Sequence, residues 1–162
     1  MLTSIEIRNF KLFDDIRLEL GDRVLLVGPN NAGKSTALQA FALWDVELKR
    51  WLEKRGTGDV PAKGSGVTIN RRKLIAVPVP VGNLLWRDLH VRSGRREKGQ
   101  TRTENVLIQV VVQGVEWTCG LEFDYANPES FYCRPSCGWT NSGAKGNTVA
   151  CPGATNTGVM AT

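Results

Sequence analysis

The chain has 162 residues, of which 41% are hydrophobic and 23% charged, a composition ordinary for one globular domain with an apolar core. It has no run of eighteen apolar residues, and charged residues interrupt its N-terminus, so we expect neither a membrane-spanning nor a secreted protein, and a cytoplasmic location. The net charge of +5 is unevenly distributed, because residues 49–102 hold fourteen Lys or Arg against four Asp or Glu.

Two short strands are the first predicted elements. Apolar and charged residues alternate in "IEIR" (5–8) and again in "IRLEL" (16–20), which is the period of a half-buried strand. Because only a short turn separates them, we expect the two strands to pair as antiparallel neighbours. A continuous apolar run, "RVLLVG" at 23–28, then predicts a strand buried on both faces of a sheet.

The next stretch, "GPNNAGKS" at 28–35, fits the phosphate-loop pattern G-x-x-x-x-G-K-[ST] between a predicted strand and a predicted helix. A loop that wraps a triphosphate turns successive backbone N–H groups inward, in conformations that glycine adopts at little cost. The N-terminus of the following helix adds partial positive charge. We therefore predict a nucleotide site made of Gly28, Pro29, Asn30, Asn31, Ala32, Gly33, Lys34, Ser35 and Thr36.

Three of these side chains have individual roles in the prediction. Lys34 would place its ammonium group between the β- and γ-phosphates, where charge shifts during phosphoryl transfer. Ser35 would ligate Mg²⁺ through its hydroxyl, and Thr36 could reach the α-phosphate. The predicted ligand is ATP with Mg²⁺.

A helix is predicted over about residues 33–55. Apolar residues recur there at spacings of four and three and form one stripe suited to packing against a sheet: Ala37, Phe41, Trp44, Leu48 and Trp51. The glycines and proline of "RGTGDVPAKGSG" (55–66) then predict a loop.

The basic region 49–102 has two interpretations. Such a cluster suits a polyanion such as DNA, because each phosphate neutralised releases condensed counterions. The alternative is a set of solvated loops beside an acidic remainder. Within the region, "VTINRR" (67–72) indicates a short strand or turn, and Pro78 and Pro80 argue against a central strand in the apolar segment around them.

A β-hairpin is predicted over residues 104–125, with Gln113 and Gly114 at its turn. Its second strand includes the acidic residues Glu122 and Asp124. No apolar run precedes these two acids, so we interpret them as solvent-facing strand residues rather than catalytic groups. The residues that alternate with them share one face: Trp117, Cys119, Leu121 and Phe123.

The C-terminal residues 134–162 contain no acidic residue and show no periodicity. We expect a domain over 1–133 and an irregular or disordered tail over 134–162, with a shifted reading frame near this boundary as one hypothesis. We expect reduced thiols and no zinc site, because only the two cysteines of "CRPSC" are close together in the set Cys119, Cys133, Cys137 and Cys151.

The segment over about residues 2–43 resembles the N-terminal head of the RecF/SMC/SbcC group of ABC-type ATPases, including its OLD-like members. Those proteins open with an I-x-I-x-N-F-[KR] strand and a second short strand, followed by G-x-N-x-A-G-K-[ST]. The matching residues are Ile5, Ile7, Asn9, Phe10, Lys11, Gly28, Asn30, Ala32, Gly33, Lys34, Ser35 and Thr36.

This resemblance implies an α/β P-loop NTPase fold: an ABC-ATPase-like lobe with N-terminal antiparallel strands, a central P-loop strand-helix unit and an additional antiparallel hairpin. It also implies that Lys11 can approach the nucleotide phosphates, the alternative being an exposed charge at a strand end. Members of the group act on DNA as head-to-head dimers that sandwich two nucleotides. The implied function is an ATPase in DNA repair or DNA metabolism, contacting DNA through 49–102 and forming a homodimer in the complete protein.

Two parts of such ATPases are not visible in the sequence: the apolar run ending in Asp-Glu and the serine- and glycine-bearing signature segment. No glutamine loop can be assigned to Gln109 or Gln113 either. Hydrolysis by this chain therefore stays open, and both a truncated head and a non-catalytic nucleotide-binding remnant fit. A transporter ATPase is disfavoured by the N-F-K opening, and a small-molecule phosphotransferase by the two strands before the loop.

Overall fold

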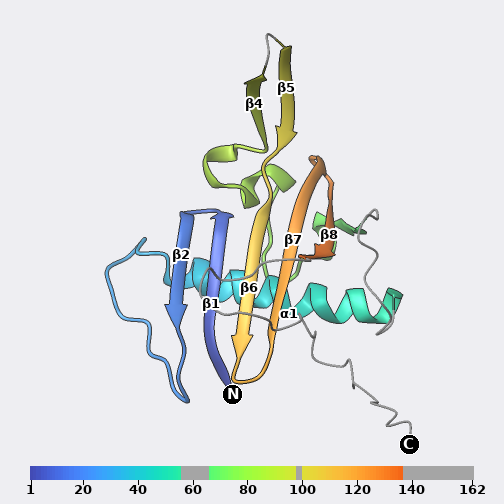
Figure 1. Cartoon of the computed structure of the whole chain (residues 1–162). Coiled ribbons are helices and arrows are strands. Elements are labelled where there is room, and N and C mark those ends of the chain that lie inside the picture. The colour runs from blue at the N-terminus through green and yellow to red at the C-terminus, as the bar shows by residue number, and fades with distance from the viewer. Residues whose placement is uncertain (56–65, 98–99, 137–162) are drawn as a thin grey trace, which may run out of the picture.

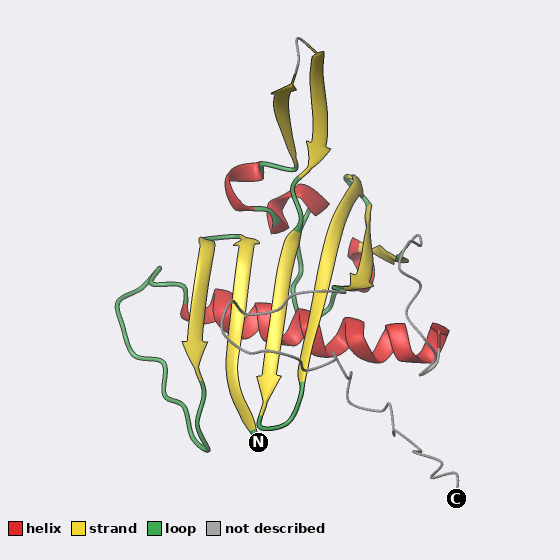
Figure 2. Cartoon of the chain, in the orientation of Figure 1, coloured by secondary structure: helices red, strands yellow, loops and turns green. Residues whose placement is uncertain are grey.

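The computed structural model describes residues 1–55, 66–97 and 100–136. Within them the fold is mixed α/β, with one α-helix, α1 (Lys34–Arg55), and a six-stranded sheet in the order β2-β1-β6-β7-β8-β3 (Figures 1 and 2). The sheet strands are β1 (Leu2–Phe10), β2 (Phe13–Glu19), β3 (Val67–Asn70), β6 (Ile108–Gly114), β7 (Thr118–Asn127) and β8 (Ser130–Pro135). Each pairing in this sheet is antiparallel.

Between β3 and β6 the chain forms three short 3-10 turns and a separate two-stranded sheet. The turns are η1 (Arg71–Lys73), η2 (Gly82–Leu85) and η3 (Arg87–Leu89), and the small sheet pairs β4 (Arg92–Glu97) with β5 (Gln100–Asn105). Figure 1 shows this hairpin standing off the end of the main sheet.

Helix α1 runs across one face of the main sheet and makes the apolar core with it (Figure 1). The indole N–H of Trp44 donates a buried hydrogen bond to the carbonyl oxygen of Cys119 on β7 at 3.0 Å. The ring of Trp44 also stacks on Trp117, with centroids 6.2 Å apart. One side chain in the middle of α1 thus attaches the helix to the sheet by both packing and a hydrogen bond.

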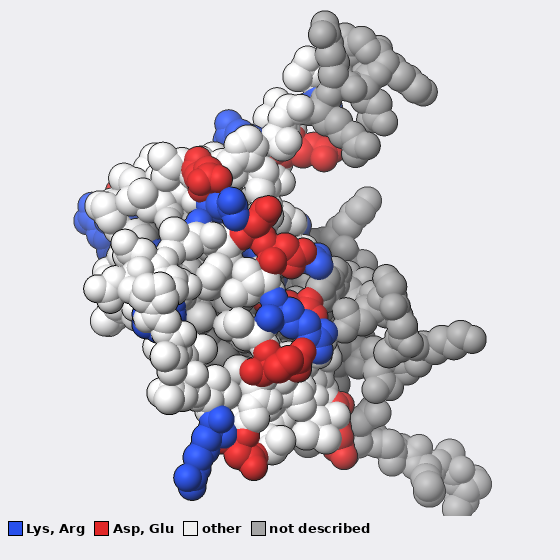
Figure 3. All heavy atoms as spheres, turned by 90° about the vertical axis from the view of Figure 1, so that its left-hand side faces the viewer, with Lys and Arg blue, Asp and Glu red and all other residues white. Residues whose placement is uncertain are grey.

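The opposite face of the sheet is polar, and its charges are matched across neighbouring strands. Glu6 lies opposite Arg17 and forms an ion pair with it at 2.9 Å, while Arg8 pairs with Asp15 at 3.0 Å. Figure 3 shows basic and acidic side chains alternating along one side of the molecule. Alternation of apolar and polar residues, as the sequence predicts, separates the two faces.

The "NFK" stretch forms the end of the β1–β2 hairpin. Asn9 and Lys11 have positive φ angles of 54° and 49°, and the Asn9 side-chain amide donates to the Leu107 carbonyl oxygen at 2.9 Å. Phe10 between them is fully buried. This local geometry explains the asparagine, because asparagine adopts positive φ more readily than most residues.

Several predicted elements are confirmed. The two N-terminal strands pair as antiparallel neighbours, and the helix spans Lys34–Arg55 with its apolar stripe against the core. The predicted hairpin forms as β6 and β7, with Cys119, Leu121 and Phe123 buried on one face. The predicted position of its turn is wrong, because Gln113 and Gly114 end strand β6 and the turn is at 115–117. Trp117 lies in the turn rather than in the second strand, and "VTIN" is strand β3.

The predicted buried strand over 23–28 is wrong. This segment is an irregular loop beside β2, and Leu25 and Val27 are 86% and 82% exposed. A strand buried on both faces needs hydrogen-bonding neighbours on both edges. The described strands pair with one another and none pairs with residues 23–28, so the P-loop helix is present without the strand of the predicted strand-helix unit.

Two further strand regions are not predicted from the sequence. The polar stretch around residue 95 forms β4 and β5, and β8 adds a strand after β7. Of the irregular tail predicted over 134–162, Arg134 and Pro135 belong instead to strand β8, where they pair with β7. The part from residue 137 onward lies outside the described residues, as do Cys137 and Cys151. Cys119 and Cys133 are buried, and neither forms a disulfide among the described residues. No helix of the described part is long and apolar enough to cross a membrane.

Glu47 is a carboxylate placed inside this core. Its side chain is fully buried on α1 and one oxygen accepts a hydrogen bond from Arg50 at 2.6 Å. The other oxygen, Oε2, has no hydrogen-bond partner among the described residues. Burial outweighs the attraction of Arg50 and Lys54 and raises the pKa of Glu47 from 4.5 to about 7.

This raised pKa predicts a specific pH dependence of stability. The folded protein binds the Glu47 proton more tightly than the unfolded chain, so the free energy of unfolding should fall as pH rises from about 4.5 to about 7. The Glu47 contribution to this fall is roughly 3 kcal/mol. Glu47→Gln should remove it in urea unfolding measured at pH 5 and pH 8.

The matched control for this measurement is Glu53→Gln, which changes an exposed carboxylate on the same helix. It should keep the pH dependence of the original chain. An unchanged pH dependence in Glu47→Gln would show that Glu47 does not titrate in this range.

Candidate functional site

The loop before α1 has the backbone geometry that its sequence predicts. Gly33 has a φ of 88° and Asn31 a φ of 67°, both in the left-handed region. The Ala37 N–H donates to the Gly33 carbonyl oxygen at 2.9 Å, which begins the helical pattern. The N–H groups of the first turn have no partner one turn earlier, so this helix end can receive an anion.

Gly33 also lies where a larger residue would displace a neighbouring ring. A Cβ atom at Gly33 would lie 2.6 Å from the ring of Phe13, the first residue of β2. The turn between β1 and β2 therefore supports the phosphate loop through the Phe13 ring. Sequence reasoning does not identify Phe13, because nothing in its local pattern distinguishes it from an ordinary strand residue.

Lys34 closes over the loop that precedes it. Its ammonium group donates to the carbonyl oxygens of Gly28 and Pro29 at 2.7 and 2.6 Å. When a triphosphate binds, its oxygens would replace these two carbonyl oxygens as acceptors. The acceptor as well as the donor would then be charged, which strengthens the hydrogen bond. The ammonium group of Lys34 is thus already held next to the loop backbone.

The other predicted loop residues differ in exposure. Residues 28–32 and Ser35 are exposed, whereas Gly33 and Thr36 are buried. The hydroxyl of Ser35 can therefore reach a ligand from solvent, and its oxygen is the type that Mg²⁺ prefers. The first turn of α1 contains no acidic residue that would repel a phosphate.

Lys11 lies against the same helix, one turn beyond the loop. Its ammonium group donates to the side-chain oxygen of Gln39 at 2.7 Å and lies 5.8 Å from the Phe10 ring centroid. Partial burial lowers the pKa of Lys11. It is thus a half-buried group engaged by Gln39, and its approach to phosphate stays a prediction.

Two hollows flank the irregular segment 23–28. A cavity of about 240 Å³ lies on its apolar side between β1, β2 and α1, and another of about 250 Å³ reaches the loop residues Ala32, Gly33 and Lys34. Leu26 lines both. The phosphate loop is therefore well anchored to α1 and to Phe13, but loosely packed on the side of segment 23–28.

The acidic candidates lie away from this loop. Glu122 and Asp124 alternate on β7 with core residues, so they belong to the polar face of the sheet, opposite to α1. Glu122 accepts hydrogen bonds from Gln109 at 3.0 Å and Arg134 at 3.1 Å, and Asp124 accepts one from Asn105. Gln109 and Gln113 are both engaged within the sheet, Gln113 by Ser4.

Comparison with known proteins finds similarity in the N-terminal part of the chain. Residues 1–49 match the family model described as AAA ATPase domain. A stretch of 43 residues is 46% identical to an OLD nuclease of Thermus scotoductus, and it covers 26% of this chain and 8% of that protein. The N-terminal segment is therefore similar to AAA-type ATPases, and the matching stretch spans only a small part of the nuclease.

The contact between Gly33 and Phe13 gives a prediction. Gly33→Ala places a side chain at positive φ and against the Phe13 ring, which should destabilise the fold by about 1–3 kcal/mol and distort the phosphate loop. Gly21→Ala is the matched control, because a Cβ there meets no atom within 4 Å. Thermal unfolding should separate the two variants, and equal melting temperatures would contradict the prediction.

Proposed function

We propose that residues 28–36 bind ATP with Mg²⁺ and that this chain is the nucleotide-binding part of an ATPase head. The observation that carries the proposal is the loop itself, with Gly33 at positive φ leading into α1 and Lys34 held across its mouth. Motif, backbone geometry and the AAA ATPase similarity of residues 1–49 agree.

In this proposal each group of the loop has a separate task. The first-turn N–H groups of α1 and the loop amides hold the phosphate chain, and Lys34 transfers its ammonium group from two carbonyl oxygens to phosphate oxygens. Ser35 would hold Mg²⁺, which when bound neutralises charge on the β- and γ-phosphates. Lys11 contacts α1 through Gln39, one turn after the loop, and would add positive potential at this end of the helix.

ATP hydrolysis is proposed for the complete protein, in which two heads meet as a homodimer. A second candidate is nucleotide binding without hydrolysis. The position of Glu122 and Asp124 favours this candidate for the chain as it stands, because these acids face away from α1 and are engaged by other side chains. Steady turnover would distinguish the two.

A role in DNA repair or DNA metabolism is the broader part of the proposal. The cations of 49–102 support it, although several of them are already in ion pairs, namely Lys49, Arg50, Arg71, Arg72, Arg87 and Arg102. The projecting β4–β5 hairpin is the part of the region best placed to enter a groove, since it stands off the main sheet (Figure 1). Contact through arginines would give strong salt dependence.

The nucleotide proposal is tested by calorimetry with ATP, with and without Mg²⁺. Lys34→Ala should weaken ATP binding by about tenfold or more, because it removes a charge-assisted contact to phosphate. Lys49→Ala is the matched control, since this exposed lysine on the same helix pairs with Asp45. Equal affinity of the Lys34 variant and the original chain would overturn the proposal.

Turnover is measured on the same samples. We expect none above background from this chain. Turnover that Lys34→Ala abolishes would instead show that the chain carries a complete catalytic set.

The DNA proposal predicts that duplex DNA binds with an affinity that falls steeply with salt. Replacing Arg92 and Arg102 together with alanine should reduce the slope of log affinity against log salt by about two, because each arginine that neutralises a phosphate adds about one to the slope. Fluorescence anisotropy of a labelled duplex measures this slope. An unchanged slope would exclude these two hairpin arginines from the DNA contact.

A further inference from the structure

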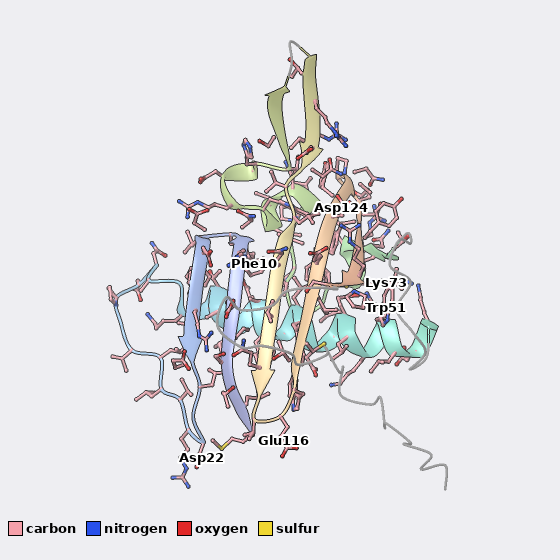
Figure 4. All side chains as sticks on the ribbon, in the orientation of Figure 1. Phe10, Asp22, Trp51, Lys73, Glu116 and Asp124 are labelled. Carbon is pink, nitrogen blue, oxygen red and sulfur yellow. The ribbon has the colours of Figure 1, made fainter. Side chains whose placement is uncertain are left out.

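A second cationic pocket lies at the C-terminal end of α1, far from the phosphate loop. Its volume is about 250 Å³, and it lies between α1, β3 and η1. Figure 4 shows Lys73 beside the half of α1 that carries Trp51. The lining residues are Arg50, Glu53, Lys54, Thr68, Asn70 and Lys73.

Positive charge in this pocket is incompletely neutralised. Among the described residues, Lys54 and Lys73 make no hydrogen bond or ion pair, and the one carboxylate in the lining is Glu53. The buried Glu47 behind the lining also attracts Lys54, but without an ion pair to it. The neighbouring cations Arg71 and Arg72 are different, because both pair with Glu129, at 2.8 and 3.3 Å. The two lysines are therefore the groups left available to an external anion.

Arg50 is held at the inner side of the same pocket. It gives one N–H to the buried Glu47 at 2.6 Å, and its side chain keeps 21% of its surface exposed. A guanidinium group has five N–H donors, so others remain for a ligand. Glu47 thereby fixes the direction of a cation that would otherwise be mobile.

Neutral donors complete the lining. Thr68 provides a hydroxyl, and the side-chain oxygen of Asn70 accepts a hydrogen bond from the backbone N–H of Arg72 at 2.9 Å, which orients the Asn70 amide. Strand β3 that carries them pairs with β8, and Arg71 ties η1 to Glu129 and to the Val79 carbonyl oxygen. The pocket walls are thus held by the sheet, so little ordering is needed to bind a ligand.

We propose that this pocket is a second phosphate-binding site, which holds a phosphate-type oxyanion independently of the phosphate loop. Guanidinium, ammonium, hydroxyl and amide donors around a small cavity match the several acceptor oxygens of a phosphate group. Residues 34 and 54 are about 30 Å apart along α1, at 1.5 Å per residue, which is too far for one nucleotide to reach both sites. The inference therefore goes beyond the proposed ATP site.

Phosphorus NMR titration of the full chain with inorganic phosphate tests the proposal, using line broadening as the measure of binding. The double variant Lys54→Ala/Lys73→Ala should weaken phosphate binding by about tenfold or more. Its binding of ATP with Mg²⁺ in calorimetry should not change, because the phosphate loop is untouched. Glu53→Gln should strengthen phosphate binding, because it removes the carboxylate from the lining.

Lys49→Ala is the charge-matched control on the same helix and should leave phosphate binding unchanged. If Lys49→Ala weakens binding as much as Lys54→Ala alone, the effect is general surface charge and the proposal is wrong. The proposal is also wrong if the double variant binds phosphate like the original chain. Loss of phosphate binding with ATP binding retained would support it even if the Lys34 prediction failed.

A competition experiment identifies the source of the phosphate. Duplex DNA that displaces inorganic phosphate, and that binds the double variant more weakly, identifies the ligand as a nucleic-acid backbone phosphate. Phosphate binding that DNA does not disturb identifies a free phosphate or a small phosphorylated molecule. Both outcomes support a site in this pocket.

Discussion

The fold depends on one packing contact, that of α1 across the apolar face of an antiparallel sheet. Trp44 secures the middle of the helix by stacking on Trp117 and by its hydrogen bond to Cys119 on β7. The helix begins at the phosphate loop and ends beside the cationic pocket, so a single rigid element positions both. Groups at its two ends can be arranged accurately because the contact between them is buried and close-packed.

The same contact explains why the phosphate loop keeps its shape although the segment before it is outside the sheet. Gly33 and Lys34 belong to the start of the helix, and the Phe13 ring supports them from β2. Segment 23–28 contributes apolar side chains but no strand pairing, and cavities remain on both sides of it. The loop geometry is therefore determined by the helix and the hairpin rather than by the strand that usually precedes such a loop.

The sequence predicts well those elements whose pattern is local. Alternation at 5–8 and the stripe of α1 are properties of single segments, and both elements form where expected. The run at 23–28 has the right composition for a buried strand, but a strand also needs partners, and composition cannot specify them. Strands β4 and β5 have no apolar face to reveal them. In the site, the motif identifies Lys34 and Ser35. The contact of Phe13 with Gly33 and that of Lys11 with Gln39 join the β1–β2 hairpin to α1, and no local pattern specifies such contacts between separate elements.

The buried ion pair of Glu47 with Arg50 is better explained by ligand binding than by stability. A buried ion pair often contributes no more than an apolar pair of the same volume, and one oxygen of Glu47 has no hydrogen-bond partner among the described residues. The pair therefore stabilises the core no better than apolar side chains of the same volume would. What it does provide is direction, because Glu47 holds the Arg50 guanidinium at the inner wall of a pocket whose other cations have no ion-pair partner in the described part of the chain. The proposed phosphate site gives a reason for keeping Glu47 in the core despite its cost in stability, because the carboxylate positions Arg50 for the phosphate.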